Sequence, residues 1–500
     1  MPNQQLKDLA ARAERFGANT NIRKMLREAL NQGETRSKDE LIAHGAALRK
    51  DVPLSEHATW IAPSNRPDPV DLLREQNQSR VQRLVPIRHE RMSASAFTFY
   101  RGAALIMAWD LSRTPLTGVE VQACGDAHIS NFGLFRSPEG RTVFDINDFD
   151  ETSVGPWEWD VKRLAASVEI CGRDNGLSKK DRKGAVLASV RGYREAMARF
   201  ANMGHLDMWY AHSDVDELAE QFLNKASKQD RKAAGKALAK AKRKDSTRAV
   251  QKLTEVVDGQ LRIVSDPPLI TPLRDLARSA GAGELVNRVD MEDVVRLVLA
   301  KYYETLPAAT RHIVTQYRGI DIAHKVVGVG SVGTRALIVV MEGADKNDPL
   351  VLQIKEAQES VLERFCGKSP FAQHGERVVK GQQALQTVGD LLLGWCRLPG
   401  EGGTFKDYYV RQLWNGKGSF DLAAMDAKRL KRFATACGWA LAHAHARTGD
   451  RFVISGYLGD DDAFDQAIAK FARAYAKQNE TDYQRFMQAI NDGELPTHTS

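Results

Sequence analysis

The sequence has few cysteines, and they lie far apart. Its 500 residues include five cysteines, and no two of them form a CxxC pair; they are Cys124, Cys171, Cys366, Cys396 and Cys437. This distribution argues against a disulfide framework and against a zinc ribbon. Such cysteine usage is typical of a reducing compartment, so we expect a cytoplasmic protein.

Long apolar runs are also missing. No stretch approaches the roughly 18 apolar residues of a membrane span, and the first five residues, MPNQQ, lack the basic-then-apolar pattern of a secretory signal. Hydrophobic residues make up 43% of the chain and charged residues 27%, which is an ordinary globular composition. There is no internal repeat and no coiled-coil heptad pattern. We therefore expect a globular protein with no membrane span.

One segment carries the net positive charge. The chain has a net charge of +7, but residues 225–252 alone contain eleven Lys or Arg and two Asp, which leaves −2 for the rest. Its Ala and Lys content predicts a helix that is basic on several faces. No aromatic residue is interleaved to stack on bases, so a nucleic acid is an unlikely partner. The segment is either a solvated arm or a contact for an acidic partner.

The pattern along the chain predicts four parts. Residues 1–55 are polar and helix-prone, and we interpret them as an N-terminal arm. Residues 56–320 would form a catalytic region in which short strands are followed by helices. Residues 321–415 are rich in strand patterns and would form a nucleotide-binding region. Residues 416–500 are helical and would complete the catalytic region, so the predicted class is α+β.

The strongest chemical signal lies in two acidic motifs joined by a predicted hairpin. The first is CGDAHISN at residues 124–131, and the second is DINDFD at residues 145–150. Phosphoryl transfer from ATP needs a carboxylate near the acceptor hydroxyl and oxygen ligands that hold Mg²⁺ against the phosphates. Asp126 and Asn131, five positions apart on a tight loop, can supply a base and one ligand. A later aspartate can supply the second ligand.

This spacing resembles the catalytic loop of the protein-kinase-like superfamily, especially the aminoglycoside and choline phosphotransferases. The resemblance implies that Asp126 is the catalytic base, that Asn131 binds the metal, and that His128 is the histidine often found in that loop. Gly125 matches the small-molecule kinases, whereas Cys124 departs from them. ATP and Mg²⁺ are the cofactors that the resemblance implies.

Three aspartates compete for the second metal position. Asp145 lies 14 residues after Asn131 and follows an apolar strand, so spacing favours it. Asp148 is a near-equal rival, because it opens an Asp-Phe-Asp sequence similar to the family's Asp-Phe-Gly, and Asp150 is a weaker third. Further on, GPWEWDVKRLA resembles a family segment in which an aspartate, here Asp160, opens a helix and hydrogen-bonds the catalytic loop from behind.

A glycine-rich motif indicates where nucleotide phosphates would bind. Residues 328–333 read GVGSVG and contain Gly328, Gly330, Ser331 and Gly333. A β-branched run follows instead of the helix that a dinucleotide site requires, and no Gly-Lys-Ser/Thr sequence follows as in a Walker A motif. Strand, glycine loop and strand is the arrangement that covers ATP phosphates in kinases.

Lys355 ends an apolar strand 22 residues after Gly333 and resembles the lysine that holds the α- and β-phosphates. Such a lysine needs a carboxylate partner on the following helix. Glu376 is the first candidate, and Glu363 and Glu359 are alternatives. The strand at residues 408–410 then leads to a hinge whose backbone would contact adenine; its residues are Gln412, Leu413 and Trp414.

The order of these motifs is reversed relative to ordinary kinases, because the glycine loop follows the catalytic loop by some 200 residues. The helix pattern at residues 432–446 resembles the helix that normally leads into the catalytic loop. A circular permutation cut between the two explains this order. The expected architecture is therefore a protein-kinase-like two-lobed fold, circularly permuted, with extra N-terminal helices.

The chain from about residue 46 to 490 is also similar to the bacterial domain-of-unknown-function family 2252. The sequence motifs that carry this resemblance are VPIR at 85–88, FYRGAA at 99–104, residues 124–131, residues 145–159 and residues 325–334. The arm at residues 1–45 and much of the basic segment do not share the pattern. The resemblance implies a kinase-like fold but does not name a substrate.

The sequence predicts a phosphotransferase that acts on a hydroxyl of a small molecule or a protein. Two alternatives stay open: transfer of AMP to protein by the same site, and a pseudokinase that binds nucleotide without turnover. Arg101, together with Arg88 and Arg91, precedes the catalytic strand. These arginines would either contact a phosphate or acceptor, or tie the N-terminal helices to the catalytic lobe through buried salt bridges.

Overall fold

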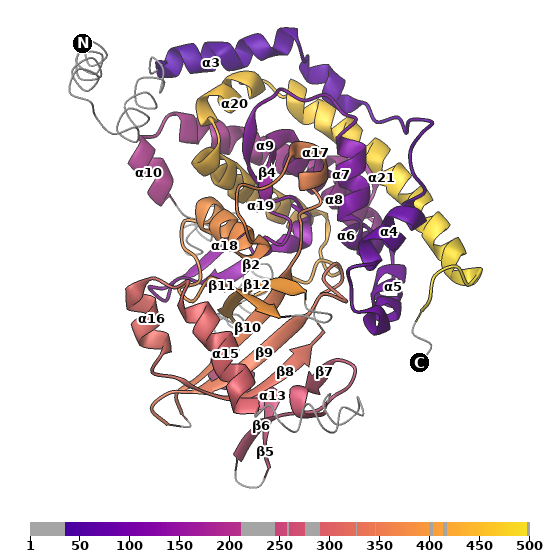
Figure 1. Cartoon of the computed structure of the whole chain (residues 1–500). Helices are drawn as coiled ribbons and strands as arrows, with labels where there is room; N and C mark the ends of the chain where they lie inside the picture. Colours follow the sequence, from indigo (N-terminus) through magenta and orange to yellow (C-terminus); the bar gives the residue numbers. More distant parts are fainter. Residues whose placement is uncertain are drawn as a thin grey trace, which may run out of the picture.

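The computed structural model describes residues 36–211, 246–257, 260–275, 291–326, 328–345, 347–399, 404–413 and 418–497. They form a helical body and an antiparallel sheet that lies beside it (Figure 1). About 52% of the chain is helix and 17% is strand, so the predicted α+β class is confirmed. Residues 1–35 of the expected arm, and the basic segment up to residue 245, lie outside the described residues.

The main sheet has six antiparallel strands in the order β11-β12-β10-β9-β8-β7. Alternate residues of β9 enter different apolar clusters: Val339 and Met341 pack with α15 (Met291–Tyr303), whereas Ile338 and Val340 pack with α13 (Ser246–Leu253). Both faces of the sheet are therefore covered. The strands are β7 (Ile270–Pro272), β8 (Arg318–Lys325), β9 (Ala336–Glu342), β10 (Pro349–Ala357), β11 (Gly394–Pro399) and β12 (Phe405–Gln412).

The boundary that the sequence suggested after residue 320 falls within β8. The elements before it also pack on the sheet: β7 pairs with β8, and α15 and α16 (Ala308–Val314) contribute to the same apolar cluster as β9 and β10. The hairpin of β5 (Thr254–Val257) and β6 (Gln260–Ile263) occupies a stretch for which the sequence pattern indicated mainly helix.

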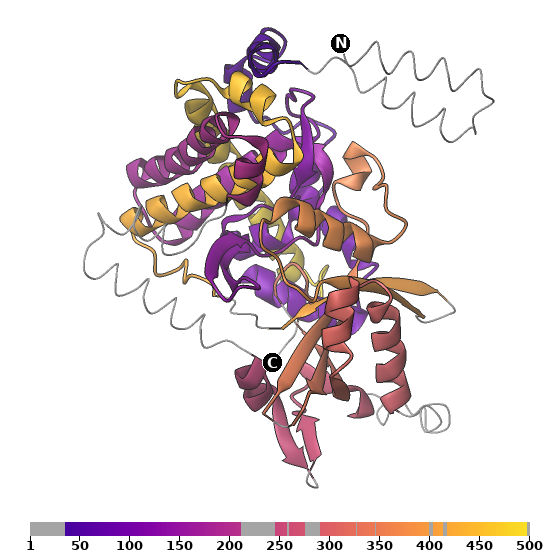
Figure 2. The ribbon, with the colours of Figure 1, turned by 90° about the vertical axis from the view of Figure 1, so that its left-hand side faces the viewer.

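The helical body is built around two long antiparallel neighbours, α9 (Lys179–Ala201) and α19 (Ala427–Thr448), which lie side by side in Figure 2. Glycines allow this close approach: a Cβ on Gly438 would lie 2.0 Å from the Ser189 carbonyl oxygen, and one on Gly192 would lie 2.6 Å from that of Thr435. The helices α8 (Trp157–Asp174), α20 (Arg451–Leu458) and α21 (Ala463–Asn491) complete the body.

The N-terminal helices pack on the helical body, chiefly on its last two helices, α20 and α21. They are α3 (Lys38–Ala47), α4 (Pro69–Asn77), α5 (Val85–Ser93), α6 (Ala96–Gly102) and α7 (Ala104–Leu111). Arg66 joins this region to α21, because its Nε lies 2.7 Å from Asp110 Oδ1 and its Nη2 lies 2.6 Å from Asp482 Oδ2. Both ends of the described chain therefore belong to one helical body.

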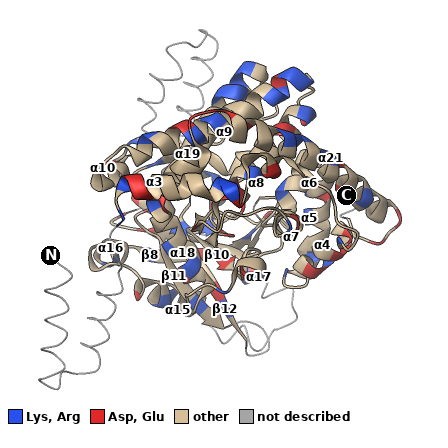
Figure 3. Ribbon diagram, turned by 90° about the horizontal axis from the view of Figure 1, so that it is seen from above, with Lys and Arg blue, Asp and Glu red and all other residues tan. Residues whose placement is uncertain are grey.

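Basic and acidic residues are mixed along the helices of the ribbon in Figure 3, in keeping with the small net charge of the chain outside the basic segment. Among the helices within the described ranges, none is both long enough and apolar enough to cross a membrane.

Candidate active site

The 124–131 loop connects two short antiparallel pairs of strands. β1 (Glu120–Ala123) pairs with β4 (Ser153–Pro156), and β2 (Phe132–Arg136) pairs with β3 (Thr142–Ile146). The pairing of Phe132 with Ile146 confirms the predicted hairpin. This hairpin places the end of β3, and the acidic residues after it, beside the 124–131 loop.

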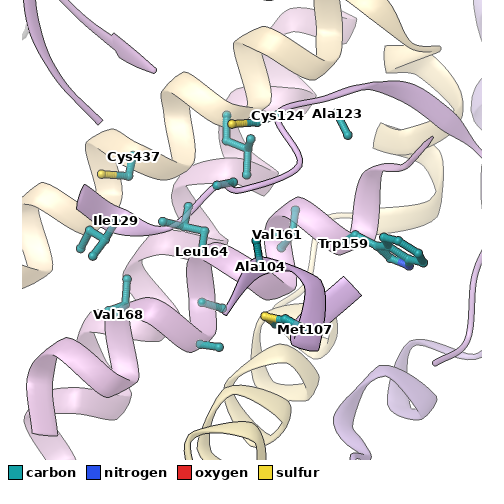
Figure 4. Close-up of a cluster of buried hydrophobic side chains, with 14 of the residues drawn as sticks. Ala104, Met107, Ala123, Cys124, Ile129, Trp159, Val161, Leu164, Val168 and Cys437 are labelled. Carbon is teal, nitrogen blue, oxygen red and sulfur yellow. The ribbon is translucent and has the colours of Figure 1, made fainter. Parts of the chain in front are cut away.

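Apolar residues fix the loop to the helical body. Ile129 lies near Leu164 and Val168 of α8, and Cys124 enters the same buried cluster (Figure 4). The Ile129 amide also donates a 2.9 Å hydrogen bond to Ser167 Oγ. Because the loop is held at both ends, the polar residues between these anchors are positioned by the core.

Asp160 holds the loop from behind. Its carboxylate accepts hydrogen bonds from the Cys124 amide at 2.6 Å and the Gly125 amide at 3.0 Å, and His445 Nε2 lies 3.2 Å from Asp160 Oδ2. Asp160 lies in the first turn of α8, where the helix dipole favours a negative charge. Gly125 has φ of +81°, and a Cβ there would lie 2.2 Å from the Glu151 carbonyl oxygen.

Asp126 forms a buried ion pair. Its Oδ1 accepts hydrogen bonds from Nε and Nη2 of Arg163 at 2.9 and 2.8 Å, and Asn131 Nδ2 donates to its carbonyl oxygen at 2.8 Å. Burial opposes ionisation, but His128 and Arg163 outweigh it and hold the pKa of the Asp126 carboxyl below its usual value. Asp126 is therefore a carboxylate at neutral pH.

His128 lies next to this carboxylate, with its Nε2 3.7 Å from Asp126 Oδ2. Burial lowers the pKa of His128 to about 4, so the ring is neutral at pH 7. Its Nδ1 is buried without a hydrogen-bond partner. A neutral imidazole with one unused nitrogen is able to hydrogen-bond a ligand that enters the site.

A cavity lies between the 124–131 loop and the glycine loop. Among the acidic residues at the end of β3 and after it, Asp148 and Asp150 line this cavity and Asp145 does not. Asp145 stays within the ladder, opposite Gly133, and its Oδ1 accepts a 2.8 Å hydrogen bond from the Ile146 amide. Burial raises the pKa of Asp145 to about 7. Of the two rival aspartates, Asp148 is therefore the one presented to the cavity, because Asp145 is retained inside the hairpin.

Lys355 on β10 points to the same acidic residues. Its Nζ forms an ion pair with Asp150 and lies 3.9 Å from Asp148 Oδ2, and Tyr409 Oη donates a 2.8 Å hydrogen bond to Asp150 Oδ1. Burial opposes the charge of Lys355, but Asp148 and Asp150 outweigh it and raise the pKa of the ammonium. The lysine is therefore charged and lies behind the cavity-lining residues Asp148 and Asp150.

The expected carboxylate partner, Glu376, does not pair with Lys355. Glu376 lies in the first turn of α18 (His374–Leu385), and Arg377 is the residue of that helix that reaches the site, where it donates to the carbonyl oxygens of Asp150 and Thr152. The alternative Glu363 lies 3.3 Å from Arg377. The alternative Glu359 pairs with Lys368.

The backbone donors expected at the hinge are already used within the protein. The Gln412 amide donates to Asp390 Oδ2 at 2.6 Å, and the Leu413 amide donates to the Val351 carbonyl oxygen at 2.8 Å. Leu413 is buried with the residues of the sheet. These two N–H groups are therefore not presented to adenine, and Trp414 lies outside the described residues.

The glycine loop between β8 and β9 lies over the cavity and contacts the N-terminal helices. Arg91 Nη1 donates to the Gly328 carbonyl oxygen at 2.6 Å, Arg80 Nη1 donates to that of Val332 at 2.6 Å, and the Val81 amide donates to that of Gly333 at 2.8 Å. We call α4 to α6, residues 69–102, the N-terminal roof. It holds the glycine loop from the side opposite the sheet.

The cavity, of about 150 Å³, lies between the 124–131 loop, the acidic residues after β3, the glycine loop and the N-terminal roof. The sequence-predicted residues that line it are Asp126, His128, Asn131, Asp148, Asp150, Gly328, Gly330 and Ser331, together with Arg101 and Glu359. The predicted residues Lys355, Gly333 and Glu376 do not line it. The sequence reasoning gave no role to Arg163, although it follows Asp160 by three positions on one helix, a spacing that places both on the same face. It also missed the cavity-lining residues Arg80 and Glu151.

The fold and the cavity define a mixed α+β protein with an acidic and basic cavity at the junction of a helical body and an antiparallel sheet. The chain belongs to the bacterial family DUF2252, described as "Uncharacterized protein conserved in bacteria", which it matches over residues 80–489. Neither a curated protein nor a solved structure matches the chain. Within the described part of the chain, no three His, Cys, Asp or Glu residues gather as a metal site.

Proposed function

We propose that this protein is a Mg²⁺- and ATP-dependent phosphotransferase with a protein-kinase-like site on a circularly permuted chain. The observation that carries the proposal is the shared cavity: Asp126, Asn131 and Asp148 line it together with Gly328 and Ser331, although some 200 residues separate the two groups. A kinase site requires this combination of a base, two metal ligands and a glycine loop.

The order of elements in the sheet supports the kinase-like part of the proposal. β8, the glycine loop and β9 are followed by β10, which carries Lys355, and then by α18. In protein kinases a strand–glycine loop–strand unit is followed by the lysine-bearing strand and then by a helix. The departure is that Asp150, rather than a glutamate of α18, pairs with the lysine.

The end of α19 supports the permutation. Thr448, the last residue of this helix, accepts a 3.2 Å hydrogen bond at its Oγ1 from the Gln122 amide of β1. A Cβ on Gly449 would lie 3.1 Å from the Glu120 carbonyl oxygen. The helix therefore ends beside the strand that leads into the 124–131 loop, so an unpermuted chain would need only a short connection there.

The side chains have complementary tasks in this proposal. Asp148 and the Asn131 amide oxygen would hold Mg²⁺, with Asp150 close by, because carboxylate and amide oxygens are hard ligands that this ion prefers. The ion would neutralise charge on the phosphates. Lys355 would bind a phosphate oxygen after leaving Asp150, and backbone N–H groups of the glycine loop would cover the triphosphate.

Asp126 would orient the acceptor. The hydroxyl oxygen of the acceptor forms a bond to the γ-phosphorus, the bond from that phosphorus to the β–γ bridging oxygen breaks, ADP leaves, and the hydroxyl proton passes to the Asp126 carboxylate. Arg163 keeps this carboxylate ionised and fixes its position, since both of its contacts are to Oδ1. Oδ2 faces His128 and the cavity side of the loop.

Calorimetric titration with ATP, with and without Mg²⁺, tests the nucleotide site. We expect Mg²⁺-dependent binding in the micromolar range that is lost in Lys355→Ala and weakened at least tenfold in Asp148→Asn. Asp145→Asn, three residues away and outside the cavity, is the matched control and should bind as the wild type does. Absence of binding by the wild-type protein would overturn the proposal.

ATP labelled at the γ- or the α-phosphate distinguishes the reactions that this site could support. Label transferred from the γ position to an acceptor supports phosphotransfer. Label transferred from the α position would replace it with AMP transfer, and binding without transfer of either label would indicate a nucleotide-binding pseudokinase.

A further inference from the structure

One partly buried arginine of the cavity has no role in the proposed function so far. Arg101, in the last turn of α6, lines the cavity with Asp126, His128 and Asp148. Its Nε is buried without a hydrogen-bond partner, and among the residues that the structure describes no carboxylate lies within ion-pair distance of its guanidinium. A partly buried guanidinium without such a partner is costly, which points to a partner that enters the cavity.

The arginine is not needed to neutralise the nearest acid. Asp126 is already bound by two nitrogen atoms of Arg163. Other residues make the ion pairs between the N-terminal helices and the body, among them Arg66 with Asp110 and Asp482, and Arg485 with Asp68. The interpretation of Arg101 as a structural salt bridge therefore loses its basis, and an anionic ligand remains the partner that its chemistry requires.

The position of Arg101 indicates which anion this is. A Cβ on Gly330 would come within 3.0 Å of the Arg101 carbonyl oxygen, so α6 meets the glycine loop directly. On the other side, the charges of Asp126 and Asp148 act on Arg101. Arg101 thus lies between the glycine loop, the acceptor-orienting carboxylate and the metal-binding carboxylate.

We infer that Arg101 binds the terminal phosphate of the nucleotide, so that the N-terminal roof supplies a residue of the phosphate site. This inference rests on the proposed function and deepens it: the site distinguishes a nucleoside triphosphate from a diphosphate through an arginine outside the glycine loop and the lysine-bearing strand. An arginine is suited to this task because its planar guanidinium donates two hydrogen bonds to one phosphate.

Hydrogen bonds within the N-terminal roof, and from the roof to the glycine loop, hold the backbone at Arg101 in position. Arg88 on α5 is fully buried, and its Nη2 donates to the Gly102 carbonyl oxygen at 2.8 Å, directly after Arg101 in the chain. Arg80 and Arg91 donate to carbonyl oxygens of the glycine loop. The backbone that carries Arg101 is thereby fixed relative to the loop that would cover the phosphates, which reduces the entropy lost on binding.

The test compares two nucleotides on the full chain by calorimetry in Mg²⁺: ADP and the non-hydrolysable ATP analogue AMP-PNP. We expect the wild type to prefer AMP-PNP by about tenfold, in line with the strength of a charge-assisted hydrogen bond to phosphate. In Arg101→Gln the affinity for ADP should stay within twofold and the preference for AMP-PNP should disappear. Arg101→Lys should retain part of the preference.

Arg113→Gln is the matched control, since Arg113 is an exposed arginine that follows the same group of helices and lies outside the cavity. It should behave as the wild type does. A preference that survives in Arg101→Gln, or an equal loss of ADP and AMP-PNP affinity in a folded variant, overturns the assignment to Arg101 while the proposed function stands. Failure of the wild type to bind either nucleotide overturns both. If Arg101→Gln does not fold, Arg101→Lys decides: a reduced preference for AMP-PNP with unchanged affinity for ADP supports the assignment, whereas the full wild-type preference or an equal loss of both affinities overturns it.

Discussion

The Nζ atom of Lys355 forms an ion pair with a carboxylate oxygen of Asp150, a residue that lies 205 positions earlier in the chain. The lysine is 2% exposed, whereas the aspartate side chain is 27% exposed. The pair joins the six-stranded sheet to the segment after the β2–β3 hairpin. In the proposed function a triphosphate has to compete with Asp150 for this lysine.

This pair predicts coupled effects on stability. Lys355→Met should lower the free energy of unfolding by about 2 kcal/mol, because it leaves the Asp150 carboxylate poorly solvated and without its cation. Asp150→Asn in the Lys355→Met background should restore most of that loss, since a neutral amide needs no counter-charge. Urea unfolding of the wild type, both single variants and the double variant measures the coupling. Strictly additive effects would show that the pair contributes nothing.

The burial of Asp145 predicts that the stability of the protein depends on pH. Burial raises the pKa of Asp145 from 3.8 to about 7 in the folded protein. The folded protein favours the protonated carboxyl of Asp145, so the contribution of this residue to stability is fully present below about pH 4. The contribution falls as the pH rises and is lost above about pH 7, where the buried carboxyl has to ionise. Asp145→Asn cannot ionise, so it should gain stability over the wild type across this window and be about 2 kcal/mol more stable at pH 8. Thermal unfolding at several pH values tests this, and a difference that is constant with pH would contradict it.

Two glycines with similar backbone angles provide a controlled comparison at the 124–131 loop. Gly125 has φ of +81° and would place a Cβ 2.2 Å from the Glu151 carbonyl oxygen, whereas Gly118 has φ of +78° and would meet nothing within 4 Å. Gly118→Ala should cost about 1 kcal/mol through backbone strain alone. Gly125→Ala should cost about 3 kcal/mol or more. Equal losses in a urea titration would mean that the loop relaxes without strain.

The hydrogen bonds of Asp160 predict different losses of stability for Asp160→Ala and Asp160→Asn. Asp160→Ala removes the acceptor of two buried backbone N–H groups and should cost about 3 kcal/mol, with a parallel loss of any transfer activity. Asp160→Asn keeps one carbonyl oxygen as an acceptor and should lose less than half as much. Chemical denaturation together with the labelled-ATP assay measures both. If Asp160→Asn is as unstable as Asp160→Ala, charge rather than hydrogen bonding holds the loop.

Local patterns predicted the parts of the fold that depend on neighbours in the chain. The hairpin of β2 and β3 follows from two apolar runs and the intervening SPEG turn, and the strand after the glycine loop follows from its β-branched residues. Spacing also selected Asp126 and Asn131, which the structure places in one cavity with Gly328. These predictions needed no knowledge of which distant segments meet.

The remaining choices depended on tertiary contacts. Spacing favoured Asp145 over Asp148, but the register of β3 retains Asp145 in the ladder. The sequence offered Glu376 as the partner of Lys355, whereas the turn after β3 brings Asp150 to it. Contacts between the N-terminal roof and the glycine loop join segments about 240 residues apart, and no local pattern encodes such a meeting.

The division of the helical body along the chain has a consequence for synthesis of the protein. α9 emerges from the ribosome more than 200 residues before α19, the helix that covers its buried face, and α21 emerges last. The apolar faces of α8 and α9 therefore stay exposed to solvent, or are covered by a chaperone, until the C-terminal helices have been synthesised. A nascent chain that stops before residue 427 would expose that surface to aggregation, even though the 124–131 loop and the entire sheet had already been translated.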